Sequence, residues 1–230
     1  MSTGRDETAL ARGLDELDAI RRRVVNVVGH ALRTPLTTMV GMATALRETD
    51  DDATRATLVE GLARNAARVE RLLDDLLLAA GVGTAMPAGD PRPVPVFETF
   101  ETEWSALANP TDLRLRGPEL TVLARAGAFE RIANAVLDNA SKYGRGPVVV
   151  TASATPRGVH IEVESEGDVP TDEEIENAFE LFYRGEHAVM ATPGLGIGLP
   201  VARELARAEG GEVALERRGT AIVVTVELPA

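Results

Sequence analysis

Two stretches in the first third of the chain repeat apolar residues at alternating spacings of four and three. The first stripe consists of Leu10, Leu14, Leu17, Val24, Val28 and Ala31, with Arg21 as its polar member, and it extends through Met39, Met42 and Leu46. The second consists of Leu58, Leu62, Asn65, Val69, Leu72, Leu76 and Ala79. Such spacing is typical of a heptad seam on an α-helix. With the polar cluster at residues 49–52 between them, the stripes predict an antiparallel helical hairpin.

An isolated hairpin of this kind leaves one apolar face uncovered. Two copies that pair through this face bury both seams in a four-helix bundle, so a homodimer is the favoured prediction. A monomeric hairpin that packs against the rest of the chain is the alternative.

The spacing of apolar residues changes after a stretch rich in Gly and Pro at residues 83–93. Short alternating strands are expected at 94–96, 113–115, 120–124, 148–154, 159–164, 212–216 and 221–228, and helices at 97–107, 129–143, 173–179 and 199–209. This order predicts an α+β fold, with one sheet covered by helices on one face. The expected domains are 1–82, a linker at 83–93, and 94–230.

The charge and composition exclude several kinds of partner. A net charge of −12 disfavours nucleic acid and anionic lipid, and the absence of Cys removes thiolate metal sites. No apolar run approaches the ~18 residues that span a membrane, and no signal peptide is evident, so a cytoplasmic location without membrane insertion is expected. Sensing would then come from a separate upstream sensor protein or domain.

The segment Gly29 to Thr37 carries the first chemical signal. His30 is expected beside the apolar seam rather than within it, where its imidazole can attack an electrophile such as a γ-phosphate. Pro35 cannot donate a hydrogen bond to the carbonyl of Ala31, which predicts a bend one turn after His30. An incidental surface histidine is the alternative interpretation of a lone His.

This nine-residue string resembles the H-box of two-component histidine kinases. The resemblance implies that His30 is autophosphorylated, that Arg33 belongs to the same catalytic segment, and that Thr34 orients water when the partner is dephosphorylated. The family usually has Glu or Asp directly after the His, as a general base. Ala31 occupies that position here, and losing a positioned base typically costs roughly 10²–10⁴-fold in rate.

A glycine-rich turn, Gly194, Gly196 and Gly198, enters a predicted helix at Leu199. Backbone N–H groups in such a turn can approach phosphate oxygens, although a flexible loop has the same composition. At the end of the helix over 129–143, Asn139 offers an oxygen ligand for Mg²⁺, Lys142 a cation for phosphate and Tyr143 a ring for a base. These three residue types are also ordinary near a helix C-terminus.

Four segments resemble the nucleotide-binding boxes of the same family in order and spacing. They are Leu137–Tyr143 (N-box), Phe179–Arg184 (F-box), Gly194–Leu199 (G2 box) and Gly219–Thr220 (last glycine box). The resemblance implies an ATP-binding domain of the GHKL type, shared with gyrase-type ATPases. It places Phe182, Arg184, Leu199 and Thr220 at the nucleotide, Mg²⁺ on Asn139, and a mobile lid at 183–193 in which His187 is solvated.

The G1 box departs from the family pattern, in which an Asp accepts a hydrogen bond from the adenine amino group. Aligned on Gly167, that position is Ser165; shifted by one residue, it is Glu164. A neutral hydroxyl bonds a base more weakly than a carboxylate does, so weakened adenine recognition is expected.

Three functions remain open on these grounds. The first is a histidine kinase that uses ATP and Mg²⁺ to phosphorylate His30, and then passes the phosphoryl group to an Asp of a response-regulator receiver domain. The second is a degenerate relative that acts as a phosphotransfer protein or phosphatase with weak or no ATP binding. The third is a dimeric scaffold or switch without enzymatic activity.

Overall fold

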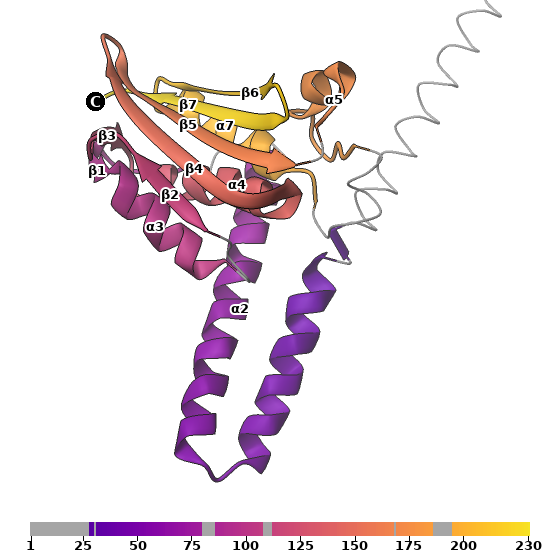
Figure 1. Cartoon of the computed structure of the whole chain (residues 1–230). Helices are drawn as coiled ribbons and strands as arrows, with labels where there is room; N and C mark the ends of the chain where they lie inside the picture. Colours follow the sequence, from indigo (N-terminus) through magenta and orange to yellow (C-terminus); the bar gives the residue numbers. More distant parts are fainter. Residues whose placement is uncertain (1–27, 30, 80–85, 108–111, 168, 186–194) are drawn as a thin grey trace, which may run out of the picture. The chain divides into compact units, whose positions relative to one another are not determined.

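The protein is described here by a computed structural model that covers residues 28–29, 31–79, 86–107, 112–167, 169–185 and 195–230 (Figure 1). Contacts along the chain define two compact units, Met1–Leu73 and Asp74–Ala230. The division falls inside one helix, α2 (Asp52–Ala79). The domain limits expected from the sequence, at 82 and 94, stay a prediction, and residues 80–85 lie outside the described part.

The N-terminal unit is a helical hairpin, as predicted. A helix over residues 31–48 passes through Pro35 without interruption, and α2 begins after a turn at residues 49–51. Asp51 caps α2 because its carboxylate accepts hydrogen bonds from the N–H and the hydroxyl of Thr54, at 2.8 and 2.6 Å. These bonds hold the pKa of Asp51 below its ordinary value. Within the described residues, no helix combines the length and apolar character needed to cross a membrane.

The two helices of the hairpin meet along the predicted seams. Met42 packs where Gly61 has no side chain, since a Cβ there would lie 2.8 Å from the Met42 methyl carbon. Within this unit, the seam residues that the structure describes are half-buried: Val28, Ala31, Met39, Met42, Leu46, Leu58, Leu62, Asn65, Val69 and Leu72. A single hairpin therefore covers its seam only in part.

The second unit is built on two sheets. Its elements in chain order are β1 (Arg92–Pro95), α3 (Val96–Ala106), β2 (Leu113–Arg116), β3 (Thr121–Ala124), α4 (Ala128–Tyr143), β4 (Gly144–Thr155), β5 (Gly158–Gly167), α5 (Asp172–Asn177), α7 (Gly198–Ala208), β6 (Glu212–Arg218) and β7 (Ala221–Leu228). Strands β1 and β3 pair antiparallel, and the five-stranded sheet has the order β2-β4-β5-β7-β6. Within it, β2 runs parallel to β4 and the other pairs are antiparallel.

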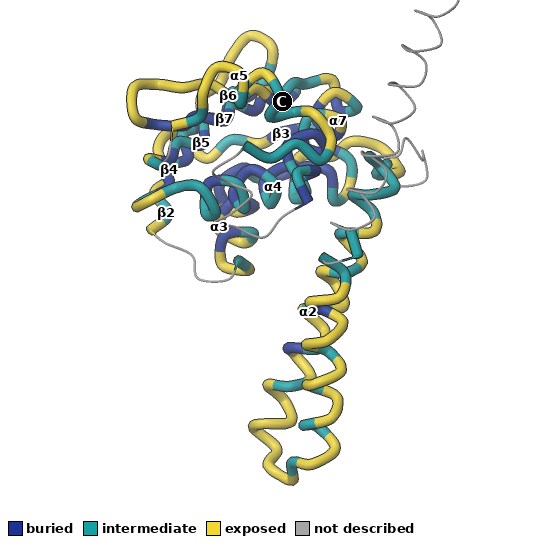
Figure 2. The backbone as a smooth tube through the Cα atoms, turned by 90° about the vertical axis from the view of Figure 1, so that its right-hand side faces the viewer, coloured by how far each residue is buried: buried dark blue, intermediate teal, exposed yellow. Residues whose placement is uncertain are grey.

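Helices α3, α4 and α7 cover one face of the five-stranded sheet (Figure 1). The core lies between these two layers, and the tube in Figure 2 is buried mainly along α4, α7 and the central strands. Phe100 of α3 contacts Phe129 of α4 edge to face, with ring centroids 5.9 Å apart. The last turn of α2 belongs to this unit, because Leu78 packs against the core and Asp75 accepts a hydrogen bond from Arg131 at 2.7 Å.

The α+β fold predicted from the sequence is confirmed. Two details differ from the prediction. Strands β1 and β3 form a sheet of their own, where a single sheet was expected. Strand β4 was expected to start at Val148 but begins at Gly144, directly after α4. Gly144 pairs with Gly167 of β5, and the register shifts between Gly144 and Val148. The early residues of β4 lack the alternating apolar pattern, which is why periodicity missed them.

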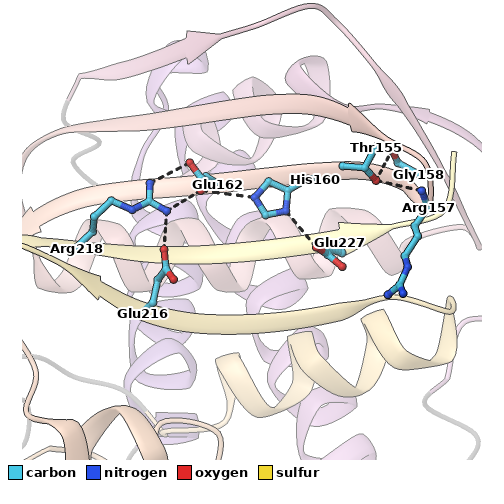
Figure 3. A network of polar contacts seen from close by, with 8 residues as sticks. All are labelled: Thr155, Arg157, Gly158, His160, Glu162, Glu216, Arg218 and Glu227. Carbon is cyan, nitrogen blue, oxygen red and sulfur yellow. Dashed lines mark hydrogen bonds and ion pairs between the residues drawn. The ribbon is translucent and has the colours of Figure 1, made fainter.

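The opposite face of the sheet carries a polar network (Figure 3). Arg218 of β6 bonds both carboxylate oxygens of Glu162, at 2.8 and 3.2 Å, and Glu216 at 2.5 Å. His160 lies between Glu227, 3.3 Å from Nδ1, and Glu162, 3.6 Å from Nε2. Hydrogen bonding and charge from Arg218 hold the pKa of Glu162 below its usual range.

Glu162→Gln is expected to make unfolding less sensitive to acid. A carboxyl whose pKa is depressed by folding stabilises the protein above its unfolded pKa, about 4.3, and this stabilisation is lost as pH falls through the lower folded pKa. Denaturant titrations at stepped pH should show wild type losing stability more steeply below pH ~4.3 than the variant. Arg218→Met should give the same flattening, and the double variant no more, because the pair acts as one unit. Identical acid profiles for wild type and Glu162→Gln would contradict the assignment.

Candidate functional site

Helix α4 positions Asn139, Lys142 and Tyr143 at its C-terminal end. Its apolar stripe is buried in the core and fixes the rotation of the helix: Phe129, Ile132, Ala133, Val136, Leu137 and Ala140. Asn139, Lys142 and Tyr143 are half-buried. The helix ends at Gly144, whose N–H donates to the carbonyl of Ala140. Lys142 is held by an ion pair with Asp138, one turn earlier.

Two glycines allow the end of α4 to touch the end of β5. A Cβ on Gly167 would lie 2.2 Å from the carbonyl oxygen of Tyr143, and one on Gly144 would lie 2.4 Å from that of Ala140. Both distances are too short for any side chain without backbone movement. The sequence predicts only that a helix ends at residue 143. The pairing of Gly144 with Gly167 joins segments far apart in sequence, so local patterns do not reveal it.

The alternation of β5 decides which side chain faces the helices. Val159, Ile161 and Val163 are buried against them, and Ser165 continues this series with 5% exposure. Glu164 and Glu166 project from the other face of the strand. Of the two alignments left open by the sequence, the register therefore favours Ser165 as the side chain directed toward α4.

A second junction joins the segment around Phe182 to the glycine turn before α7. Phe182 has a positive φ of 65°, and its N–H donates to the carbonyl of Gly196 at 2.9 Å. Gly196 also has a positive φ, 68°, and a Cβ there would lie 2.4 Å from the carbonyl oxygen of Tyr183. The turn between residues 195 and 198 is thus fastened to residues 182–183.

The start of α7 lies beside α4. A Cβ on Gly198 would be 3.8 Å from the Cβ of Ala135, which is one helical turn before Asn139. Leu199 is buried in the core and anchors the first turn of α7. The structure therefore brings Gly196, Gly198 and Leu199 to the same side of α4 as Asn139.

Arg203 of α7 links this helix to Phe179 and to strand β6. Its role was not predicted from the sequence. Its guanidinium carbon lies 3.3 Å from the ring centroid of Phe179, and its Nε donates to the carbonyl of Val213 at 2.9 Å. Burial lowers the pKa of Arg203, which stays charged at neutral pH. No local pattern links Arg203 with Phe179, so only the tertiary contact reveals the pair.

Some of the remaining predicted site residues lie in the described part of the chain, and others lie outside it. Thr220 is exposed in the β6–β7 turn, and the pairing of Glu166 with Ala221 places this turn beside the end of β5. Arg184 is half-buried, two residues after Phe182. In the hairpin unit, Arg33 and Thr34 are exposed on the helix over residues 31–48. His30, Gly194, His187 and most of the expected lid lie outside the described residues.

The chain thus combines an α+β unit, which has glycine junctions beside Asn139, with a helical hairpin. Residues 125–230 match the family model of the histidine kinase-, DNA gyrase B- and HSP90-like ATPases. Residues 20–81 match the His Kinase A (phospho-acceptor) domain. The chain belongs to the histidine kinase family and carries both of its core domains.

Several curated relatives are named as sensor proteins. The chain is 30% identical to the sensor protein KdpD of Mycobacterium tuberculosis (98% of this chain, 28% of that protein). It is 28% identical to a bacteriophytochrome of Pseudomonas aeruginosa (93% and 30%) and 26% identical to the sensor protein VanSC of Enterococcus gallinarum (95% and 63%). The chain thus spans between 28% and 63% of the length of these relatives.

Solved structures share the fold. Full-length ShkA in complex with AMPPNP superposes with a TM-score of 0.60 at 24% identity, over 90% of this chain and 45% of that one. The Acinetobacter baumannii histidine kinase AdeS gives a TM-score of 0.56 at 18% identity, over 87% and 97%.

Proposed function

We propose that this chain is a histidine kinase that binds Mg²⁺ and ATP in its α+β unit and transfers the γ-phosphoryl group to His30. The phosphoryl group then passes to an aspartate of a response-regulator receiver domain. The observation that carries this proposal is that two of the predicted glycine segments meet the C-terminal half of α4. Gly167 contacts the backbone at Tyr143, and Gly198 lies beside Ala135, one turn before Asn139.

The residues at this end of α4 fit a metal-bound nucleotide. Mg²⁺ keeps several waters and usually takes only one or two protein oxygens besides the substrate phosphates. The half-buried Asn139 can supply one such oxygen. The helix α7 begins at Gly198, where the helix dipole favours negative charge such as that of a phosphate. ShkA, which has the same fold, was solved in complex with AMPPNP.

The transfer step needs positioning more than covalent chemistry from the protein. An imidazole nitrogen of His30 attacks the γ-phosphorus while the bond from that phosphorus to the β–γ bridging oxygen breaks. ADP leaves with that electron pair, and the ring loses one proton to water. Lys142 and Arg184 are the cations proposed to offset phosphate charge. Arg33 and Thr34 are proposed to act beside His30, with Thr34 orienting water for dephosphorylation.

The proposed active form is a homodimer. The half-buried hairpin seam is accompanied by exposed apolar side chains: Leu36 (47% exposed), Val40 (67%), Val59 (52%) and Leu73 (51%). A second copy would cover these side chains and complete a four-helix bundle. The mass of the full chain by light scattering tests this assembly directly.

The function is tested by incubating the full chain with γ-labelled ATP and Mg²⁺. Wild type should take up acid-labile label, His30→Gln should take up none, and a phosphorylated receiver should appear when the cognate regulator is added. His160→Gln is the matched control, since His160 lies on the opposite sheet face and should not alter labelling. Equal labelling of wild type and His30→Gln would refute the proposal.

Asn139→Ala is expected to weaken the binding of Mg²⁺ and ATP by about 10–100-fold, since a ligand of a charged group is lost. Asn134→Ala is the control on the same helix. The amide of Asn134 bonds Glu103 at 2.8 Å, away from the proposed site, so ATP affinity should be unchanged. Titration calorimetry measures both variants. An unaltered affinity for Asn139→Ala would show that the nucleotide binds elsewhere.

A further inference from the structure

The side chain of Arg203 makes three contacts at once. Its guanidinium carbon lies 3.3 Å from the centroid of the Phe179 ring. Its Nε donates to the carbonyl of Val213 at 2.9 Å and lies 3.0 Å from the carboxylate of Glu212. The side chain is 27% exposed, so solvent screens these contacts only in part. Only arginine suits this combination, because its planar guanidinium can stack on a ring while an N–H in its plane donates to a carbonyl.

Phe179 begins a short segment that backbone hydrogen bonds hold in a tight turn. The N–H of Tyr183 donates to the carbonyl of Glu180 at 3.2 Å. Within this turn, the N–H of Phe182 donates to the carbonyl of Gly196 at 2.9 Å. Phe179 itself is partly buried and packs against the core. Because the segment is so short, a contact that fixes the ring of Phe179 also restrains the turn that follows it.

This segment is attached at two points to α7 and to the glycine turn before it. One point is the hydrogen bond from Phe182 to Gly196, just before α7 begins. The other is the contact of Arg203 with Phe179, more than one turn into the helix. A single attachment would allow the segment to pivot, whereas two attachments fix its orientation relative to α7. Arg184, a cation proposed for the phosphates, directly follows this segment.

We infer that Arg203 is a positioning residue for nucleotide binding, which holds Phe179 on α7 and thereby orients the segment that carries Phe182 and Arg184. This inference rests on the proposed function and adds to it a residue that acts through another side chain. The Nε of Arg203 is directed to the carbonyl of Val213 in β6, so the guanidinium supports the ring of Phe179 from the sheet side of α7.

The test measures ATP binding by Arg203→Met, a change that keeps an apolar stem but removes the cation and the N–H donor. The ATP dissociation constant, measured with Mg²⁺ and the full chain, should rise about 5–30-fold, because a partly buried cation–π contact and a hydrogen bond are lost. Transfer from a phosphorylated receiver back to His30 should be unchanged, since His30 belongs to the hairpin. An equal loss in both assays would indicate a general structural defect and would overturn the inference.

Arg207→Met is the matched control on the same helix. Arg207 lies one turn later and bonds the same Glu212 at 3.1 Å, and it also pairs with Glu204 at 3.5 Å. Its side chain is 51% exposed, so solvent screens both pairs. The ATP affinity of Arg207→Met should therefore equal that of wild type. A loss as large as that of Arg203→Met would assign the effect to Glu212 and would refute the role of Phe179.

A double-mutant cycle tests whether Arg203 acts through Phe179. Phe179→Leu should weaken ATP binding about as much as Arg203→Met, and the double variant should be no weaker than either, because both remove the same contact. Multiplied losses in the double variant would show that Arg203 acts by another route. Arg203→Lys keeps the cation without the planar donor, so its affinity should lie between those of wild type and Arg203→Met.

The inference and the proposed function fail in different ways. Unchanged ATP affinity in Arg203→Met would overturn the inference and leave the proposed function intact, whereas wild type that binds no ATP would overturn both. The fluorescence of Trp104, buried in α3, reports whether each variant is folded. If Arg203→Met does not fold, Arg203→Lys decides, and wild-type affinity in that variant would refute the requirement for a planar guanidinium.

Discussion

Arg125→Ala is expected to lower the free energy of unfolding of the α+β unit by about 3–5 kcal/mol, because it strands a buried carboxylate. The Glu209 side chain is 1% exposed, and its Oε1 accepts from Arg125 Nη1 at 2.9 Å. The same nitrogen also bonds the carbonyl of Ala208 at 3.1 Å. Among the residues that the structure describes, the Glu209 carboxylate would keep only the backbone N–H of residue 125, which lies 3.1 Å from its Oε2.

Arg114→Ala is the matched control for this prediction. Arg114 forms an ion pair of similar length with Asp112, 2.8 Å, but both side chains are more than half exposed. Solvent screens such a pair, so Arg114→Ala should lower the free energy of unfolding by no more than about 0.5 kcal/mol. Denaturant unfolding can follow the unit through Trp104, the only tryptophan, which is 6% exposed in α3. If Arg125→Ala and Arg114→Ala lowered the free energy of unfolding by similar amounts, burial of Glu209 would not explain the effect.

Gly196→Ala is expected to destabilise the same unit by about 2–4 kcal/mol and to disturb the junction with Phe182. The substitution combines a left-handed backbone, φ 68°, with a Cβ that would lie 2.4 Å from the carbonyl oxygen of Tyr183. Each of these features costs on the order of 1–3 kcal/mol, and the backbone carbonyl cannot move aside as a flexible side chain would.

Gly198→Ala provides the contrast two residues later. Gly198 starts α7, has no positive φ, and its nearest neighbour for a new Cβ is Ala135 at 3.8 Å, an ordinary contact. Alanine favours a helix over glycine by up to about 1 kcal/mol, so stability should be unchanged or slightly raised. Thermal unfolding of both variants measures the difference. A destabilisation by Gly198→Ala equal to that of Gly196→Ala would mean that the turn is held by other contacts.

The sequence determined the helices, the strands and the architecture of this protein. The heptad spacing from Leu58 to Ala79 and the alternation from Val159 to Val163 are local patterns, set by which faces of a helix or strand are buried. Their periods can be read without knowing the partners, because backbone geometry alone fixes them. The boxes around Asn139, Phe182 and Gly196 were likewise located by their residues, although their chemical roles stay predictions.

The tertiary structure decided how those segments meet. The choice of Ser165 over Glu164, the contact of Gly144 with Gly167 and the stacking of Arg203 on Phe179 all depend on register between distant elements. The buried pair of Arg125 and Glu209 joins residues 84 positions apart. Local sequence patterns do not predict contacts between such distant residues. The stabilisation that these contacts give depends on burial, and the residues are buried only after the helices have packed on the sheet.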